Sequence, residues 1–482
     1  MQLDSHPLFH QQCFINGHWC DADNGATTPV VNPATGDIIG HAPALTPEQI
    51  QAAITSAQQA QLAWQQQTAK VRSEKLYKWY QLLVEHAQDI AFIITCEQGK
   101  PLAEAKAEVM YAASYVQWYA EEAKRIYGEQ IPAHQSDLSI HVSKQAVGVC
   151  AAITPWNFPA AMITRKLAPA LAAGCSMLVK PAPQTPFTAF ALAKLAHQAG
   201  FPAGLVNVLT GDANMLGQCF TESPIIRKIS FTGSTAVGVK LMQQSAPTLK
   251  KLSLELGGNA PFIVLADADV DQAVTGLMLS KFRNNGQTCI CANRIYVHQS
   301  IYAEFGEKLS QAVAKLHVGR GDDPRVTTGP LINLAAVEKV QQQVDDALSK
   351  GAKLICGGQR HQLGRHFYQP TILANVTAQM LCTKQETFGP VAPLIEFDSV
   401  EDVINQANDT EFGLAAYVFG ENRQQLNHVV NALEYGMVGI NTGLISTEVA
   451  PFGGIKSSGF GREGGRQGLE EYLTLKYKCH KY

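Results

Sequence analysis

The chain has 482 residues, of which 46% are hydrophobic and 16% are charged, and its formal net charge is −3. This composition is typical of a globular protein of two or three domains and excludes a disordered chain. Nucleic acid and anionic membranes, which select for basic patches, are not expected as partners. Residues 1–12 lack the features of a secretory signal. No uncharged apolar run approaches the ~20 residues needed to cross a bilayer.

The eleven cysteines are scattered singly along the chain. An odd number of cysteines without the spacing of a disulfide framework is typical of a reducing compartment rather than of a secreted protein. We therefore expect a cytoplasmic protein without disulfide bonds, in which most of these cysteines are small buried apolar residues.

The predicted elements begin with a strand and turn at 14–19, and three amphipathic helices follow at 47–66, 69–98 and 102–125. From residue 146 on, short apolar runs alternate with helical segments. The first series of runs covers residues 148–153, 176–179, 205–209, 228–231 and 251–254. Near-continuous apolar strands that alternate with helices predict a buried parallel sheet.

A second series of apolar runs predicts a second α/β domain. It covers residues 262–265, 294–297, 354–356, 391–397, 414–419 and 437–440. Segments 126–145 and 472–482 have the pattern of exposed β structure outside the two cores. Because exposed strand edges need covering, we expect a partner subunit at these segments.

The first candidate motif is Phe-Thr-Gly-Ser-Thr-Ala-Val-Gly at 231–238. It follows an apolar strand and opens a helix, which is where a helix N-terminus can bind a phosphate group. Its glycines have the spacing G-x-x-x-x-G, so it is not the G-x-G-x-x-G dinucleotide fingerprint. A phosphate site and a plain strand-to-helix turn both remain open for this motif.

The second motif is Gly-Gln-Thr-Cys-Ile-Cys at 286–291. Cys289 has small and polar neighbours just after an amphipathic helix, so it is a candidate nucleophile, although a buried structural thiol is the alternative. A metal pair is disfavoured because C-x-C lacks the usual spacer and no second Cys/His pair follows, so no metal site is expected. A reversible disulfide between Cys289 and Cys291 is a further hypothesis, opposed by the strain of so short a loop.

Two further residues are candidates for acid–base and oxyanion chemistry. Glu255, in Leu-Glu-Leu-Gly-Gly-Asn at 254–259, is a carboxylate among apolar residues at a strand end, where its pKa should be raised. It suits a general base, or else it is a structural carboxylate. Asn157, in Thr-Pro-Trp-Asn-Phe-Pro at 154–159, follows the first strand of the predicted sheet. It could donate a hydrogen bond to an oxyanion, or it could simply stabilise a turn.

Taken together, five motifs resemble the signatures of the aldehyde dehydrogenase superfamily and occur in its order and spacing. They are Trp-Asn-Phe-Pro at 156–159, Phe-Thr-Gly-Ser at 231–234, Leu-Glu-Leu-Gly-Gly at 254–258, Gly-Gln-Thr-Cys at 286–289 and Glu-Thr-Phe-Gly-Pro at 386–390. The resemblance covers nearly the whole chain, from residues 32–34 to 451–454.

This resemblance implies an α/β fold of the aldehyde dehydrogenase type. A Rossmann-type parallel-sheet cofactor domain is expected at 1–125 and 146–256, and an α/β catalytic domain at 257–454. A small β oligomerisation flap would be formed by 126–145 and 455–482. The assembly implied is a homo-oligomer, a dimer of dimers.

The resemblance also implies roles for individual residues. Cys289 would be the nucleophile, Glu255 would activate the deacylating water, and Asn157 would hold the oxyanion together with the backbone N–H of Cys289. The residues implied in binding a nicotinamide cofactor are Thr154, Pro155, Trp156, Asn157, Lys180, Ala182, Pro183, Gly211, Gly233, Ser234, Val237, Leu256, Glu386 and Phe388.

A narrower resemblance, to the succinate-semialdehyde dehydrogenases, rests on residues 160–166, 281–285 and 443–446. It implies oxidation of succinate semialdehyde to succinate, with Arg165, Arg283 and Ser446 binding the far carboxylate. Guanidinium groups bind carboxylates bidentately, and an anion gives two arginines a reason to share a pocket. The alternative is that each arginine pairs with a surface acid. Glutarate semialdehyde stays open because one methylene is worth only ~1–3 kcal/mol of discrimination.

Single residues bear on two remaining questions: whether the chain belongs to another class of protein, and whether it uses NAD or NADP. A CoA-acylating relative would dispense with Glu255, and a non-catalytic, crystallin-like descendant would be expected to have lost Cys289 or Glu255. Pro183 stands where relatives often have Glu, which favours NAD, or Ser, which favours NADP. Proline neither repels a 2′-phosphate nor offers it a hydroxyl group. The sequence therefore favours NADP only slightly, with Lys180 supplying the positive charge, and both cofactors are expected to function.

Overall fold

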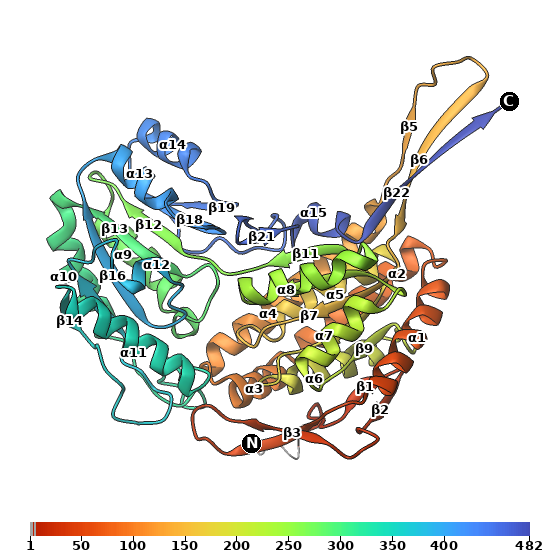
Figure 1. Ribbon diagram of the computed structural model, residues 1–482, viewed down its shortest axis with the longest axis horizontal. Helices are drawn as coiled ribbons and strands as arrows, with labels where there is room; N and C mark the ends of the chain where they lie inside the picture. The colour runs from red at the N-terminus through yellow and green to blue at the C-terminus, as the bar shows by residue number, and fades with distance from the viewer. Residues whose placement is uncertain (1–2, 4–5) are drawn as a thin grey trace.

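A computed structural model of the chain describes residue 3 and residues 6–482. Two α/β bodies lie side by side, each built around its own sheet, and a thin β arm extends from the first body (Figure 1). This arrangement confirms the predicted α/β class. The amino-terminal ribbon β3 (Thr27–Val31) and β4 (Ile38–Pro43) runs below both bodies in Figure 1.

The first sheet has eight strands in the order β2-β1-β9-β8-β7-β10-β11-β21. Its five central strands are parallel, as predicted, while the hairpin of β1 and β2 at one edge and β21 at the other are antiparallel to their neighbours. The strands are β1 (Cys13–Ile15), β2 (His18–Cys20), β7 (Val149–Ile153), β8 (Ser176–Lys180), β9 (Val206–Val208), β10 (Ile226–Thr232), β11 (Lys251–Glu255) and β21 (Gly459–Phe460). Because β8 lies between two strands and under helices, all five of its residues are buried.

The helices of the first body are α1 (Pro47–Trp64), α2 (Ala69–Glu85), α3 (Ala87–Gln98), α4 (Leu102–Glu122), α5 (Ala161–Ala173), α6 (Pro186–Gln198), α7 (Ala213–Glu222) and α8 (Thr235–Ser245). α1 begins with a capping box in which Thr46 and Gln49 satisfy each other's backbone N–H groups, followed by Pro47. α5 is buried along its whole length because it lies between the sheet and α4.

The single helix predicted over 69–98 is wrong. The helix breaks at His86, whose φ of −97° and ψ of 19° end α2, and α3 starts at the next residue. The imidazole of His86 contacts the carboxylate of Asp89, in the first turn of α3, at 2.9 Å. Amphipathic periodicity continues through the break, so the pattern alone did not reveal it.

The second sheet has the order β14-β15-β16-β13-β12-β18-β19, and only β14 is antiparallel to its neighbour. Its strands are β12 (Ala260–Val264), β13 (Ala292–His298), β14 (Lys353–Cys356), β15 (Thr371–Ala374), β16 (Val391–Phe397), β18 (Ala415–Phe419) and β19 (Met437–Ile440). The sequence pattern missed β15. Phe262 and Val264 face one apolar core while Ile263 faces another, as the two-residue period of a strand requires.

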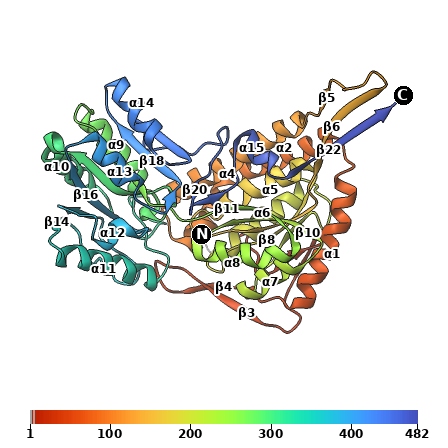
Figure 2. The ribbon, with the colours of Figure 1, turned by 45° about the horizontal axis from the view of Figure 1, so that its top comes forward.

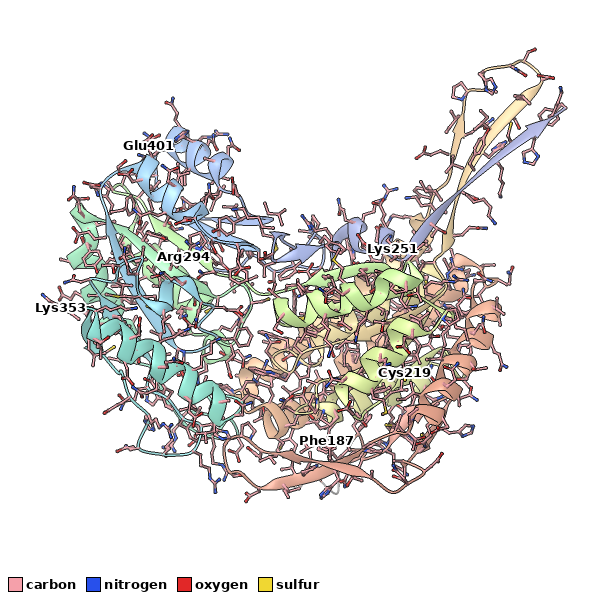
Figure 3. All side chains as sticks on the ribbon, in the orientation of Figure 1. Phe187, Cys219, Lys251, Arg294, Lys353 and Glu401 are labelled. Atoms are coloured by element: carbon pink, nitrogen blue, oxygen red, sulfur yellow. The ribbon has the colours of Figure 1, made fainter. Side chains whose placement is uncertain are left out.

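Helices cover both faces of this sheet. They are α9 (Val270–Lys281), α10 (Tyr302–Val313), α11 (Leu334–Ser349), α12 (Leu381–Lys384), α13 (Val400–Asn408) and α14 (Arg423–Ala432). Arg294, labelled in Figure 3, is buried inside this body and donates to the carbonyl oxygens of Gln406 and Ala407. It thereby satisfies carbonyl groups in the last turn of α13, which have no partner within the helix.

The arm is a three-stranded antiparallel sheet of β5 (Glu129–Ile131), β6 (Leu138–Ala146) and β22 (Leu473–Lys481). It projects away from the first body in both views (Figures 1 and 2). The end of the chain is thus paired with a segment more than 300 residues earlier in the sequence.

Residues 455–472 lie apart from the arm. β20 (Ile455–Lys456) pairs with β17 (Phe412–Gly413), and β21 pairs with β11 of the first sheet. α15 (Gly465–Glu470) then packs against α4 and α5. The chain therefore passes to the second body between β11 and β12 and returns to the first body after residue 454. Among the described residues, no helix is long and apolar enough to cross a membrane.

Leu178, in the middle of β8, is fully buried, and we predict that Leu178→Ala lowers the free energy of unfolding of the first body by about 2–5 kcal/mol. Urea unfolding followed by circular dichroism measures this loss. Leu62→Ala, at a position that is 55% exposed on α1, is the matched control and should change it by less than about 0.5 kcal/mol. Equal effects of the two variants would contradict the burial of β8.

Candidate active site

Two cavities meet at the junction of the two bodies, and Cys289 lines both of them. The first, of about 200 Å³, is lined largely by α4, α5 and the loop before Phe452. The second, of about 290 Å³, lies at the carboxyl ends of β7, β10 and β11. These strand ends are where ligands bind in open α/β sheets.

The loop that carries Cys289 is held rigidly. It starts with the turn Arg283–Gly286, in which Asn284 and Asn285 have positive φ angles of 50° and 56°. The Tyr417 hydroxyl then donates to the carbonyl oxygen of Ile290 at 2.7 Å. A Cβ atom at Gly258 would lie 2.4 Å from the Cys289 carbonyl oxygen, so only glycine permits this close approach.

Burial raises the pKa of the Cys289 thiol to about 12, even though Arg165 lowers it in part. The carboxylates of Glu386 and Glu255 contribute to the increase. The group is therefore a protonated thiol at neutral pH in the cofactor-free protein. Nucleophilic attack requires a base that takes its proton.

Asn157 lies in the loop after β7 and is buried. Its side-chain Nδ2 donates to the carbonyl oxygen of Gln287, two residues before Cys289, at 3.1 Å. Its own carbonyl oxygen accepts hydrogen bonds from Lys100 Nζ at 2.7 Å and from Asn284 Nδ2 at 3.0 Å. The structure therefore brings the candidate oxyanion donor next to the candidate nucleophile.

Lys100 and Glu108 form a buried ion pair at 2.6 Å that fixes this loop. Glu108 Oε1 also accepts from the backbone N–H groups of Ala160 and Ala161, at the start of α5. Because Lys100 bonds both Glu108 and the Asn157 carbonyl, it joins the loop to α4. Removing either charge would leave the other buried without its counter-charge, which typically costs about 3–5 kcal/mol.

Glu255 lies at the end of β11, and both carboxylate oxygens are buried without a hydrogen-bond partner among the described residues. It does not appear among the residues that line the two cavities. Burial raises its pKa well above the ordinary value, and the nearby Glu463 raises it further, while Arg165 and Lys166 oppose the change. A carboxylate with this pKa and free oxygens is a stronger base than an exposed one.

Glu463 is a second buried carboxylate, and it pairs with two cations of α5. Lys166 Nζ donates to it and to the hydroxyl of Thr232, and Arg165 Nε lies 2.7 Å from its Oε2. Burial alone would favour the neutral acid, but these cations hold the pKa of Glu463 below its ordinary value. The predicted arginine thus has a carboxylate partner, which is buried rather than on the surface.

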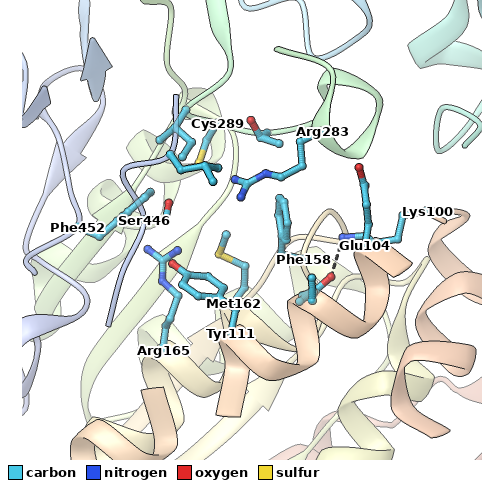
Figure 4. A pocket seen from close by; sticks show the side chains of 15 residues that line it. Lys100, Glu104, Tyr111, Phe158, Met162, Arg165, Arg283, Cys289, Ser446 and Phe452 are labelled. Carbon is cyan, nitrogen blue, oxygen red and sulfur yellow. Dashed lines mark hydrogen bonds and ion pairs between the residues drawn. The ribbon is translucent and has the colours of Figure 1, made fainter. Parts of the chain in front are cut away.

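Arg165 and Arg283 both line the first cavity, and Figure 4 shows their guanidinium groups turned toward its middle. The Arg165 guanidinium also stacks over Phe452 at 3.9 Å. Arg283 makes no ion pair with any residue that the structure describes, and its guanidinium carbon lies 5.4 Å from the ring centre of Phe158. Ser446 lines the same cavity, so the three predicted substrate residues are brought together.

The second cavity contains most of the predicted cofactor residues. They are Pro155, Trp156, Asn157, Gly233, Ser234, Leu256, Glu386 and Phe388. Trp156 and Phe388 pack edge to face with ring centres 5.6 Å apart. Burial raises the pKa of Glu386 to about 7, although Lys339 lowers it in part.

The residues at this cavity fit a dinucleotide. α8 opens onto it, and the side chain of its N-cap Ser234 makes no capping hydrogen bond with the part of the chain that the structure describes. The N–H groups of the first turn therefore remain available for an anion such as a pyrophosphate. A carboxylate such as Glu386 is a suitable acceptor for ribose hydroxyl groups.

The other predicted cofactor residues lie near the ends of neighbouring strands and outside this lining. They are Thr154 after β7, Lys180, Ala182 and Pro183 at the end of β8, Gly211 after β9, and Val237 in α8. Lys180 Nζ donates to the adjacent Pro181 carbonyl at 3.2 Å, and burial lowers its pKa to about 8.

Cys291 is buried and does not belong to the lining of either cavity. Its thiol donates to the carbonyl oxygen of Lys281 at 3.4 Å. All eleven cysteines are free. A disulfide between Cys291 and Cys289 stays a prediction. Among the described residues, no group of side chains suits a metal ion.

Comparison with known proteins identifies the fold and the family. The profile described as "Aldehyde dehydrogenase family" matches residues 19–478. The chain belongs to the aldehyde dehydrogenase family.

Relatives within the family resemble this aldehyde dehydrogenase over its full length. It is 58% identical to succinate-semialdehyde dehydrogenase (NADP(+)) of Escherichia coli strain K12 and 57% identical to glutarate-semialdehyde dehydrogenase of Pseudomonas putida KT2440, with 99% of each chain covered. The crystal structure of a succinate-semialdehyde dehydrogenase from Burkholderia pseudomallei superimposes with a TM-score of 0.98 at 54% identity, covering 99% of both chains. The predicted aldehyde dehydrogenase fold is thereby confirmed.

Sequence reasoning missed several residues that organise the site of this aldehyde dehydrogenase. Lys100 lies between Gly99 and Pro101 before a helix, a context typical of an exposed turn. Glu108 and Glu463 carry no local sign of burial. Their partners are distant in the chain, so no short motif could have revealed them.

Alkylation of Cys289 by iodoacetamide should quicken about tenfold per pH unit from pH 7 to pH 10 in the cofactor-free protein. The thiolate is the reactive form, and with a pKa of about 12 its fraction keeps rising over this whole range. Mass spectrometry of the Cys289 peptide measures the rate, with free N-acetylcysteine as the internal control. A plateau below pH 9 would contradict the raised pKa.

Proposed function

We propose that the protein oxidises succinate semialdehyde to succinate, with NADP or NAD as the hydride acceptor. The observation that carries this proposal is the position of Cys289 between a cavity with two arginines and a cavity suited to a dinucleotide. The identity to a succinate-semialdehyde dehydrogenase supports the substrate. The carboxylate of the substrate would lie at Arg283, Arg165 and Ser446, with its aldehyde directed toward Cys289.

The first chemical step forms a bond between the Cys289 sulfur and the aldehyde carbon. The thiol proton passes to a base, and the carbonyl electron pair moves to oxygen, which becomes an oxyanion. Asn157 Nδ2 and the backbone N–H of Cys289 would stabilise this charge, and loss of one such donor typically costs about 10²–10³ in rate. A nicotinamide cofactor held by the residues of the second cavity would supply the hydride acceptor for the oxidation, which leaves the acyl group on the Cys289 sulfur as a thioester.

The second step releases the acid. Water adds to the thioester carbon, its proton passes to Glu255, and the carbon–sulfur bond breaks to return the Cys289 thiolate. Burial raises the pKa of the Glu255 carboxyl, which makes its ionised form a stronger proton acceptor. Both of its oxygens lack partners among the described residues, so they are available to a water molecule.

Glutarate semialdehyde is the second candidate, because the chain is nearly as similar to a glutarate-semialdehyde dehydrogenase. One additional methylene changes binding by only ~1–3 kcal/mol. The ratio of kcat/KM for the two semialdehydes decides between them, and we propose that it favours succinate semialdehyde.

We propose that NADP is preferred over NAD. Lys180 could compensate the 2′-phosphate charge, and Pro183 brings no carboxylate that would repel it. The NADP(+) named for the Escherichia coli relative supports this preference. We also propose that the β arm joins subunits in a dimer of dimers, because exposed apolar side chains such as Leu475 and Tyr477 lie on it.

Glu255→Gln should give a burst of one reduced cofactor per active site followed by a steady rate at least about 100-fold below that of the wild type. The amide cannot accept the water proton, so the thioester accumulates. Rapid-mixing absorbance of the reduced cofactor measures both phases. Cys289→Ala is the control and should show neither phase. A Glu255→Gln variant without a burst would place its role before thioester formation.

Arg283→Met should raise the KM for succinate semialdehyde by roughly tenfold to a hundredfold, because losing one charge-assisted hydrogen-bond partner costs about 1.5–3 kcal/mol. The KM for butanal, which has no carboxylate, should change less than threefold. Arg283 is a cleaner test than Arg165, whose replacement would leave Glu463 without one of its cations. Arg423→Met, at an exposed position of α14, is the control. Equal increases for the two aldehydes would undo the substrate assignment.

A further inference from the structure

Asn284 occupies a central place between the loop of Asn157 and the loop of Cys289. It is the second residue of the turn Arg283–Gly286 and is only 2% exposed. All its polar groups are bonded: its N–H donates to Glu104 Oε2 at 2.9 Å, its Oδ1 accepts from Gln98 Nε2 at 3.1 Å, and its Nδ2 donates twice. A buried amide with every partner satisfied is strongly fixed in orientation.

The two hydrogen bonds from Asn284 Nδ2 close a triangle. One reaches the Asn157 carbonyl oxygen at 3.0 Å and the other the Gln287 carbonyl oxygen at 3.3 Å. The Gln287 carbonyl oxygen also accepts from Asn157 Nδ2 at 3.1 Å. The loop after β7 and the loop before Cys289 are therefore connected through one side chain.

This triangle sets which way the Asn157 amide faces. Its Nδ2 group points to the Gln287 carbonyl oxygen, and the opposite orientation would bring two oxygens together. One N–H of the amide is used in this contact, and the second remains for another acceptor. The orientation of the Asn157 amide therefore depends on the position of the Gln287 carbonyl group, which is hydrogen-bonded to Asn284 Nδ2.

We propose that Asn284 is a positioning residue for the oxyanion donor: its side-chain amide fixes Asn157 relative to Cys289. The inference rests on the proposed role of Asn157. Asn284 does not line either cavity, so it acts through Asn157 and Gln287 rather than on the substrate. A displacement of about 1 Å in a reacting geometry can cost about a hundredfold in rate.

A purely conformational role for Asn284 is the alternative, because its φ of 50° lies in the left-handed region that asparagine tolerates. The next residue offers a matched control. Asn285 has a similar φ of 56°, is equally buried, and donates its Nδ2 to the distant Gly329 carbonyl. Glycine at either position keeps the backbone conformation and removes only the side chain.

The first experiment compares Asn284→Gly with Asn285→Gly in single-turnover cofactor reduction with succinate semialdehyde. We expect Asn284→Gly to slow the burst about tenfold to a hundredfold, with the KM and the dissociation constant of NADP changed less than threefold. Asn285→Gly should stay within about threefold of the wild-type rate. Equal slowing by both variants, or none by Asn284→Gly, overturns the proposal.

The second experiment uses Asn284→Asp, which has the same shape but presents an oxygen to the two carbonyl groups. Its ionised carboxylate should slow the burst more than Asn284→Gly, because it repels both carbonyl oxygens. Burial, the two carbonyl oxygens and Glu104 favour the neutral form of the new carboxyl group, while Lys100 and Arg283 favour its carboxylate. The neutral form, which donates one hydrogen bond, accumulates as pH falls. The rate relative to the wild type should therefore rise from pH 9 to pH 6. A ratio that is independent of pH overturns the proposal.

A double-variant cycle separates this inference from the proposed function. If Asn157→Ala alone leaves the burst rate unchanged, the oxyanion role of Asn157 fails. If Asn157→Ala slows the burst and Asn284→Gly slows it by the same factor in the Asn157→Ala background as in the wild type, only the positioning role fails. The expected result is that Asn284→Gly has an effect below threefold in that background.

Discussion

The buried ionic groups of the first body constrain the whole site. Lys100 with Glu108, and Arg165 and Lys166 with Glu463, are all removed from water, and an unpaired charge in such a place would be strongly destabilising. Lys100 and Glu108 also hydrogen-bond to the loop of Asn157 and to the start of α5, while the pairing with Glu463 joins α5 to the segment after β21. These ion pairs therefore fix the positions of the loop of Asn157 and of Arg165 in the first cavity.

Desolvation shifts the pKa values of the other ionisable groups of the site in the same direction. Burial raises the pKa of Cys289, of Glu255 and of Glu386 above their ordinary values. Because the thiolate is the reactive species, a raised pKa of the Cys289 thiol lowers the fraction that can react at neutral pH. Cationic groups nearby, above all Arg165, oppose the shift. The balance between burial and these cations sets how readily the nucleophile can be activated.

The sequence predicted the parts of this structure that depend on local patterns. Apolar runs located nearly all strands of both sheets, since buried parallel strands are continuously hydrophobic, and the five motifs located Cys289, Glu255 and Asn157. The break at His86 and the short β15 escaped because their local patterns resemble uninterrupted helix and loop. The pairing of Arg165 with Glu463 escaped for another reason: the two residues are nearly 300 positions apart, and only the folded chain brings them together.

The return of the chain to the first body has a consequence for synthesis on the ribosome. Lys166 and its partner Glu463 are separated by 297 residues, which take roughly 15–60 s to translate at about 5–20 residues per second. During that interval Arg165 and Lys166 of α5 lack their carboxylate partner, and the edge of β11 lacks its neighbouring strand β21. The nascent first body is therefore incomplete until almost the entire polypeptide has emerged. A premature stop shortly before codon 463 would leave Arg165 and Lys166 buried without their carboxylate, although both sheets would already have been synthesised.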